Sequence, residues 1–101
     1  LEGIVKPVER EGNRHVWHQY TIRVNGDHDR DEAVAKLNAA GIGTGIFYPI
    51  PAHMHDYMRD VVGDIGLPVT ERVAGEVISI PVHPQLSGDD LEQVVAGVNG
   101  L

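Results

Sequence analysis

Gly41-Ile-Gly-Thr-Gly-Ile-Phe-Tyr-Pro-Ile-Pro-Ala-His53 is the stretch around which the rest of this 101-residue chain is arranged. Its first glycine follows a helical pattern, where a left-handed residue is needed to end the helix. Gly43 and Gly45 interrupt a run that otherwise alternates like a strand. We therefore expect a strand over Gly43–Tyr48, whose backbone is approached closely by a ligand or by a neighbouring helix. Tight packing or a bulge is the ordinary structural explanation for such glycines.

The two prolines that follow the glycines define a corner. Pro49 and Pro51 have no backbone N–H to donate, so they exclude regular strand pairing and favour an extended exit from the strand. A stiff exit of this kind presents Tyr48 and His53 in fixed directions. This stretch alone does not name a function.

Composition limits the classes of protein to which the chain can belong. A length of 101 residues allows one small domain with one core, and 42% apolar residues is ordinary for a folded chain. The net charge of −7 and the scattered basic residues argue against nucleic acid as a partner. No apolar run is long enough to span a bilayer, so no membrane partner is expected. The absence of cysteine suits a reducing, cytoplasmic location.

Hydrophobic periodicity predicts about three strands and about four helices. The predicted strands are Val16–Val24, Gly43–Tyr48 and Val77–Ile80. The predicted helices are Asp29–Ala40, Ala52–Val62, one that starts at Pro68, and one that starts with a capping box at Ser87. These elements predict an α+β fold, with helices packed on a small mixed or antiparallel sheet. Residues 1–14 lack any period and are expected to be a linker or a partly ordered entry segment before a single domain over residues 15–101.

A complete catalytic site is not expected from these residues. The six histidines are not at the spacing of a closed metal site, and no G-x-S-x-G motif is present. Lys6 and Lys36 are the only lysines, and neither lies where a lysine would be desolvated for imine chemistry. The sequence therefore predicts no catalytic residue, no metal ligand and no cofactor-binding residue in this chain.

Three polar side chains remain as candidates for substrate binding. His18 lies on the first predicted strand, Tyr48 ends the second, and His53 follows the proline corner. Imidazole and phenol groups at strand ends are suitable hydrogen-bond partners for a hydroxylated ligand. Each could equally be a half-buried polar residue whose hydrogen bonds are made within the protein.

Three ordered blocks resemble one known family. They are His15-Val-Trp-His-Gln-Tyr-Thr-Ile-Arg-Val24, then the glycine-rich stretch quoted above, then Pro68-Val-Thr-Glu-Arg-Val-Ala-Gly-Glu-Val-Ile-Ser-Ile-Pro-Val-His-Pro84. Together they resemble the C-terminal domain of the DegT/DnrJ/EryC1/StrS aminotransferases. The resemblance covers nearly all of the chain from about His15 onward. Each block by itself would be weak.

The resemblance implies the small domain of a fold-type-I, pyridoxal-phosphate-dependent sugar aminotransferase. Family members transfer an amino group from glutamate or glutamine to a keto group on a nucleotide-linked sugar, usually as cytoplasmic homodimers. The imine-forming lysine and most cofactor contacts belong to a large N-terminal domain, so the fragment is expected to be inactive when isolated. The resemblance places Tyr48 and His53 near the substrate side of the cleft, and His18 matches a recurring histidine. Many relatives have histidine where this chain has Phe47, which puts the accepted sugar in question.

Two alternatives stay open. The strand, helix and strand pattern also allows a freestanding α+β ligand-binding or regulatory module. Some relatives lack the imine lysine and carry out sugar dehydration on the same fold, and the deciding position lies outside this sequence. A domain taken from a larger enzyme should expose an apolar patch, for which Trp17, Phe47, Met54 and Met58 are the candidates.

Overall fold

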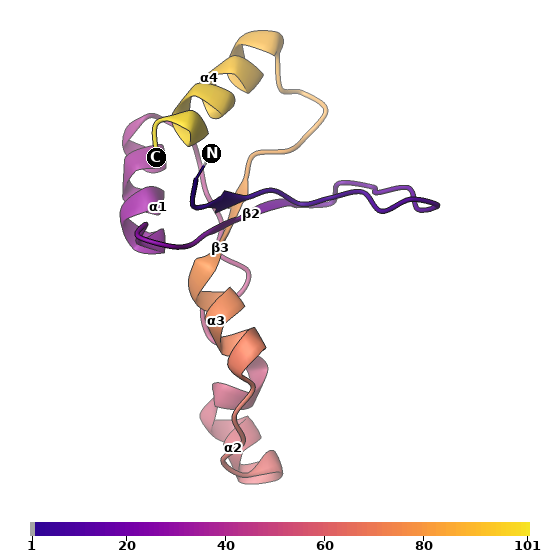
Figure 1. The fold of residues 1–101 in the computed structure, drawn as a ribbon, viewed down its shortest axis with the longest axis vertical. Coiled ribbons are helices and arrows are strands. Elements are labelled where there is room, and N and C mark those ends of the chain that lie inside the picture. Colours follow the sequence, from indigo (N-terminus) through magenta and orange to yellow (C-terminus); the bar gives the residue numbers. More distant parts are fainter. Residues whose placement is uncertain (1) are drawn as a thin grey trace.

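A small antiparallel sheet forms the centre of the molecule. The computed structural model describes residues 2–101. The strands β1 (Ile4–Val5), β2 (Tyr20–Val24) and β3 (Val77–Ile80) lie in the order β1-β2-β3 (Figure 1). β2 pairs with β3 in a register that places Tyr20 opposite Ile80 and Arg23 opposite Val77. The α+β fold expected from the sequence is confirmed.

Four α-helices and one short 3₁₀ turn complete the described residues. They are α1 (Arg30–Ala39), η1 (Ala52–Met54), α2 (Asp56–Val62), α3 (Pro68–Glu76) and α4 (Gly88–Asn99). The Asp29 side chain caps α1 by accepting hydrogen bonds from the backbone N–H groups of Asp31 and Glu32. Gly41, with a φ of 77°, ends α1 in the left-handed conformation that the sequence predicts.

The last helix begins at the predicted capping box. The Ser87 hydroxyl accepts a hydrogen bond from the backbone N–H of Asp90, and the Asp90 carboxylate accepts one from the backbone of Ser87. Hydrogen bonds from the Ser87 hydroxyl and backbone N–H hold the pKa of Asp90 below its usual value. Asp89 and Asp90 also place negative charge at the positive end of the helix dipole.

The core lies between the sheet, α1 and α4. Its buried members come from both strands of the main pair, both helices and the glycine-rich stretch: Ile22, Val24, Ala33, Leu37, Ile42, Ile78, Val94 and Val98. Gly97 allows α4 to approach closely, because a Cβ at this position would lie 2.2 Å from Cδ1 of Ile42. The Gln93 side chain donates to the carbonyl oxygen of Ala40 at 2.8 Å and fixes α4 against the end of α1.

The first predicted strand is shorter than its alternating pattern suggests. We expected a strand over Val16–Val24, but β2 begins only at Tyr20. Trp17 has a φ of 49°, a conformation that bulky residues adopt rarely and that cannot continue an extended strand. Its ring is stacked between the rings of His15 and Tyr20. Local aromatic stacking therefore replaces strand pairing before Tyr20.

The predicted strand over Gly43–Tyr48 is wrong. Only Gly45 pairs with the sheet, through two backbone hydrogen bonds with Ser79 at 2.7 and 2.9 Å. The glycine-rich stretch thus lies along the free edge of β3 without forming a ladder. The proline corner then leads the chain away from the sheet, as expected.

Two further elements differ from the sequence prediction. Residues 1–14, expected to be a linker or a partly ordered entry segment, contain the edge strand β1, in which Ile4 pairs with Val24. The single helix expected over Ala52–Val62 is divided into η1 and α2, because His55 adopts an extended conformation between them.

The chain forms two regions of different character (Figure 1). The body consists of β1, β2, β3, α1 and α4. The arm, residues 49–76, contains η1, α2 and α3 and projects from the body, so that the molecule is 48 Å long. Neither α2 nor α3 contains a buried residue. Within residues 2–101, no helix is long and apolar enough to cross a membrane.

Candidate functional site

A shallow groove of about 350 Å³ lies at the free edge of β3. We call it the edge groove. Three segments that are distant in the sequence meet there: the residues before β2, the glycine-rich stretch, and the end of β3 with the two residues after it. Its lining residues are His18, Gln19, Gly43, Thr44, Gly45, Phe47, Ser79, Ile80, Pro81 and Val82. The structure therefore brings His18 to the glycine-rich stretch, whereas Tyr48 and His53 do not line the edge groove.

The aromatic ring of Phe47 lies over Gly45. A Cβ at Gly45 would come within 2.6 Å of Cε2 of Phe47, so only glycine leaves room for the ring in this position. Phe47 is nevertheless 48% exposed and presents part of its ring to solvent. Gly43 has no atom within 4 Å of its ideal Cβ position in the described part of the chain. The rest of the described chain therefore provides neither the neighbouring helix nor the tight packing that the sequence indicates for Gly43.

Tyr48 lies beside the edge groove and does not line it. Its side chain is 74% exposed, and its ring meets the ring of Phe47 edge-on, with 5.8 Å between the ring centroids. The phenol is therefore accessible to a partner or ligand that approaches from solvent. Its role in substrate binding stays a prediction.

His53 lies in the arm, and its side chain is directed into the arm. It is the one buried residue of the arm, at 8% exposure, and its Nε2 lies 2.9 Å from Oε1 of Glu71 at the start of α3. The same carboxylate oxygen accepts the backbone N–H of Leu67 at 2.8 Å. These hydrogen bonds, first the one from His53, lower the pKa of Glu71 below its ordinary value of 4.5. Whether His53 also contacts substrate stays a prediction.

The structure adds three polar residues to the candidate site that the sequence prediction did not include. Gln19 and Thr44 line the edge groove beside His18, and the Ser79 hydroxyl lies 2.8 Å from the hydroxyl of Thr21 on the paired strand. Two of these residues carry a signal in the sequence. Thr44 stands between two glycines, and Ser79 is the one polar residue of a buried strand. Gln19 carries no such signal.

The chemistry of the edge groove suits binding of a hydroxylated ring. Imidazole, amide and hydroxyl groups can exchange hydrogen bonds with sugar hydroxyls, and the Phe47 ring offers an apolar face on which a sugar ring can pack. Among the described residues, no three acidic or histidine side chains are grouped as metal ligands are. The groove thus contains binding groups without a paired nucleophile and base.

Comparison with protein families decides the assignment. The model of the DegT/DnrJ/EryC1/StrS aminotransferase family matches residues 1–99. The chain belongs to this family. The resemblance stated from the three sequence blocks is confirmed, and the match includes the N-terminal residues that those blocks do not cover.

Two curated relatives match almost the whole chain. A pleiotropic regulatory protein of Geobacillus stearothermophilus is 39% identical over 93 residues, which is 91% of this chain and 24% of the relative. The dTDP-3-amino-3,4,6-trideoxy-alpha-D-glucose transaminase of Micromonospora megalomicea subsp. nigra is 38% identical over 98 residues, 95% of this chain and 25% of the relative. The chain therefore spans about a quarter of the length of these relatives.

Solved structures of family members contain the same fold. A DegT/DnrJ/EryC1/StrS aminotransferase from Brucella abortus is 33% identical, with a TM-score of 0.83 over 97% of this chain and 26% of its own. DesV of S. venezuelae, in complex with a ketimine intermediate, is 29% identical, with a TM-score of 0.84 over 97% of this chain and 26% of its own. NtdA of Bacillus subtilis, solved with bound cofactor PMP, is also 29% identical, with a TM-score of 0.84 over 98% of this chain and 23% of its own.

The residues of this chain do not fit a pyridoxal phosphate site. An imine-forming lysine needs a desolvated position, yet Lys6 and Lys36 are both exposed. Neither lysine lines the edge groove. The groups in the edge groove are suited to the sugar side of a cleft and not to the cofactor. We therefore derive no chemical step through the cofactor from this chain.

Proposed function

We propose that this chain is the C-terminal small domain of a pyridoxal-phosphate-dependent aminotransferase that acts on a nucleotide-linked keto-sugar. The observation that carries the proposal is the match, over 95% of the chain, to a transaminase named for a dTDP-linked amino sugar. In this proposal glutamate or glutamine donates the amino group, and the cofactor is held by the part of the polypeptide outside these residues. The isolated chain is then inactive, and the whole enzyme acts as a cytoplasmic homodimer.

The chain's own contribution to the reaction is binding and orientation. His18 and Gln19 offer hydrogen bonds to sugar hydroxyls, while Phe47 provides an apolar face. Tyr48, next to Phe47 in the chain, has an accessible phenol. Groups that hold the sugar in the reactive orientation raise the rate without taking part in the proton transfers. The contact of His53 with Glu71 fixes the start of α3 relative to the proline corner, and a direct contact of His53 with the sugar stays a prediction.

An absorption measurement tests this proposal. The polypeptide encoded by the whole gene is purified with added pyridoxal phosphate, and its visible spectrum is recorded before and after addition of L-glutamate. A transaminase shows the absorption of covalently bound cofactor, which shifts to that of the amino form when glutamate is added. The measurement is repeated with L-glutamine. Bound cofactor whose absorption responds to neither glutamate nor glutamine supports the dehydratase alternative. A spectrum without bound cofactor contradicts the proposed function.

A regulatory module is the second candidate, because one relative with 39% identity is named a pleiotropic regulatory protein. In that case the edge groove binds a ligand without converting it. The absorption test separates the two functions, since a binding module without enzyme activity takes up no pyridoxal phosphate. Titration with nucleotide sugars then shows whether the groove still binds a sugar.

A further inference from the structure

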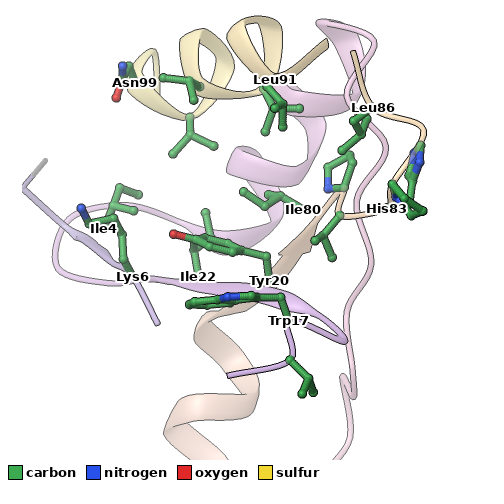
Figure 2. A pocket seen from close by; sticks show the side chains of 17 residues that line it. Ile4, Lys6, Trp17, Tyr20, Ile22, Ile80, His83, Leu86, Leu91 and Asn99 are labelled. Atoms are coloured by element: carbon green, nitrogen blue, oxygen red, sulfur yellow. The ribbon is translucent and has the colours of Figure 1, made fainter. Parts of the chain in front are cut away.

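A second and larger cavity opens between α4 and the start of β2. It has a volume of about 1020 Å³ and is lined mostly by apolar side chains. We call it the helix groove. Figure 2 shows Leu91 of α4 on one side and Trp17 and Tyr20 on the other, with Leu86 and Ile80 between them. The helix groove lies on the face of the sheet that α1 and α4 cover, beyond the edge of α4.

The apolar stripe of α4 is only partly buried. Leu91, Val94, Val95 and Val98 stand at helical spacing and all line the helix groove. Val94 and Val98 are buried, whereas Leu91 is 51% and Val95 58% exposed. The exposed part of the stripe therefore has the character of a packing surface.

The charges around the helix groove indicate the kind of partner. The chain contains 15 acidic residues, and none of them lines this cavity. Lys6 is the one lysine or arginine that does, and it stands at the end formed by the N-terminal segment. A partner with an apolar face and a carboxylate near Lys6 would be complementary in shape and in charge.

We propose that the helix groove holds an amphipathic helix of the same polypeptide, from the part outside these 101 residues. The chain spans about a quarter of its curated relatives, which provides residues for this role. Ile4 of β1 lines the cavity together with residues of α4, so the N-terminal strand and the last helix border the same space. A helix beside α1 and α4 would extend the existing layer over the sheet. The inference rests on the proposed function only in that the chain is part of a longer polypeptide.

A second copy of the chain is a poorer occupant of the helix groove. In a symmetric dimer the same patch of each copy meets at the axis, so one concave surface would face another and leave the space unfilled. The cavity needs a convex element, and a single helix of the same polypeptide provides one at high local concentration.

Site-specific photocrosslinking in the whole polypeptide tests the inference. A benzophenone amino acid replaces Val95, on the rim of the helix groove, and in a matched control it replaces Glu92, an exposed α4 residue that does not line the cavity. We expect Val95 to cross-link within one polypeptide chain to a peptide outside these 101 residues. That peptide should have apolar residues at helical spacing. The control should cross-link at several-fold lower yield.

Three results would overturn the inference. One is a product with the mass of two chains at position 95, which would assign the helix groove to a second copy. Another is equal yield at positions 95 and 92. The third concerns stability: Val95→Glu should lower the melting temperature of the whole polypeptide by several degrees more than Glu92→Lys does, and equal shifts would contradict the proposal.

The outcomes for the helix groove and for the proposed function are separable. Cross-linking at position 95 in a polypeptide that binds no cofactor would support the helix in the groove and contradict the proposed aminotransferase function. Bound cofactor that responds to glutamate, together with no cross-link at position 95, would support the aminotransferase function and contradict the helix in the groove.

Discussion

The body and the arm both contain helices with apolar side chains, but they use those side chains differently. In the body, α1 and α4 bury Leu37, Val94 and Val98 against the sheet. In the arm, α2 and α3 bury none, and Val61 is 77% exposed. A helix of seven or nine residues is not stable in water without tertiary packing. The body therefore has the contacts of a folding unit, whereas the arm depends on what it packs against.

The connection between the two regions is polar. Arg23 of β2 donates through Nε and Nη2 to Oε2 of Glu76, at 2.8 and 2.6 Å, and Arg30 of α1 donates to the carbonyl oxygen of Ala74 at 3.3 Å. These contacts fix the last turn of α3 to the body. The far end of the arm has only its local hydrogen bonds, of which the contact between His53 and Glu71 spans the longest sequence distance within the arm.

The largest expected effect is loss of the body core. Leu37→Ala removes a side chain that is 1% exposed, and we expect it to lower the free energy of unfolding by about 2–5 kcal/mol. Val61→Ala in the arm removes a similar apolar group that is already in water and should change this free energy by less than about 0.5 kcal/mol. Urea unfolding measures both. Equal destabilisation by the two variants would show that the arm shares the core of the body.

A close helix contact gives the next largest effect. Alanine at Gly97 would favour the helix by about 1 kcal/mol in isolation. Its methyl group, however, would lie 2.2 Å from Cδ1 of Ile42 and 3.3 Å from Cδ2 of Leu37, two buried side chains with little room to move. We therefore expect Gly97→Ala to destabilise the body by about 1–3 kcal/mol. A more stable variant would mean that α4 can shift away from Ile42 without loss of packing.

The same contrast explains which elements the sequence could predict. The left-handed Gly41 after α1 and the capping box at Ser87 before α4 both appear as expected. α1 also lies within the helix predicted over Asp29–Ala40, and Asp29 itself is its cap. Caps and apolar spacing are local properties, so a single sequence contains them. Val77–Ile80 was also predicted from a local signal, because a short β-branched run between a helix and a proline favours a strand over other secondary structure.

The differences from the prediction depend on contacts between distant residues. Alternation predicts strands over Val16–Val24 and Gly43–Tyr48, but the left-handed Trp17 stops the first, and only Gly45 of the second reaches β3. The edge strand β1 has two residues, too few for any period. The candidate site follows the same rule. Of the three residues predicted to bind substrate, only His18 lines the edge groove, and the burial of His53 depends on Glu71, 18 residues away.

The arm should lose stability in acid through Glu71. Hydrogen bonds from His53 and Leu67 lower the pKa of Glu71 in the folded chain, so this carboxylate stabilises the arm fully above the ordinary value of 4.5. The contribution is lost as the pH falls from 4.5 through the lower folded-state pKa. Hydrogen exchange should therefore show that the α3 amides lose protection as the pH falls below 4.5, after correction for intrinsic rates. The first turn of α4 should also lose protection in acid, because the pKa of Asp90 is lowered as well.

Glu71→Gln is the matched variant for this acid response, because it keeps the shape of the side chain but cannot ionise. Its α3 amides should exchange faster than wild type at neutral pH and show no extra increase from this group in acid. An unchanged acid response in this variant would show that Glu71 does not cause the effect.

The smallest effect on stability is expected at Tyr48, where the arm leaves the body. Its exposed phenol makes no hydrogen bond among the contacts of the described residues, so Tyr48→Phe should leave the unfolding of the chain unchanged. If the phenol binds sugar in the whole enzyme, loss of one hydrogen bond of about 1 kcal/mol should lower kcat/KM for the nucleotide sugar roughly fivefold. The absorption of bound pyridoxal phosphate should stay as in wild type. Loss of that absorption would place Tyr48 on the cofactor side of the cleft, and unchanged kinetics would leave it as a surface residue at the base of the arm.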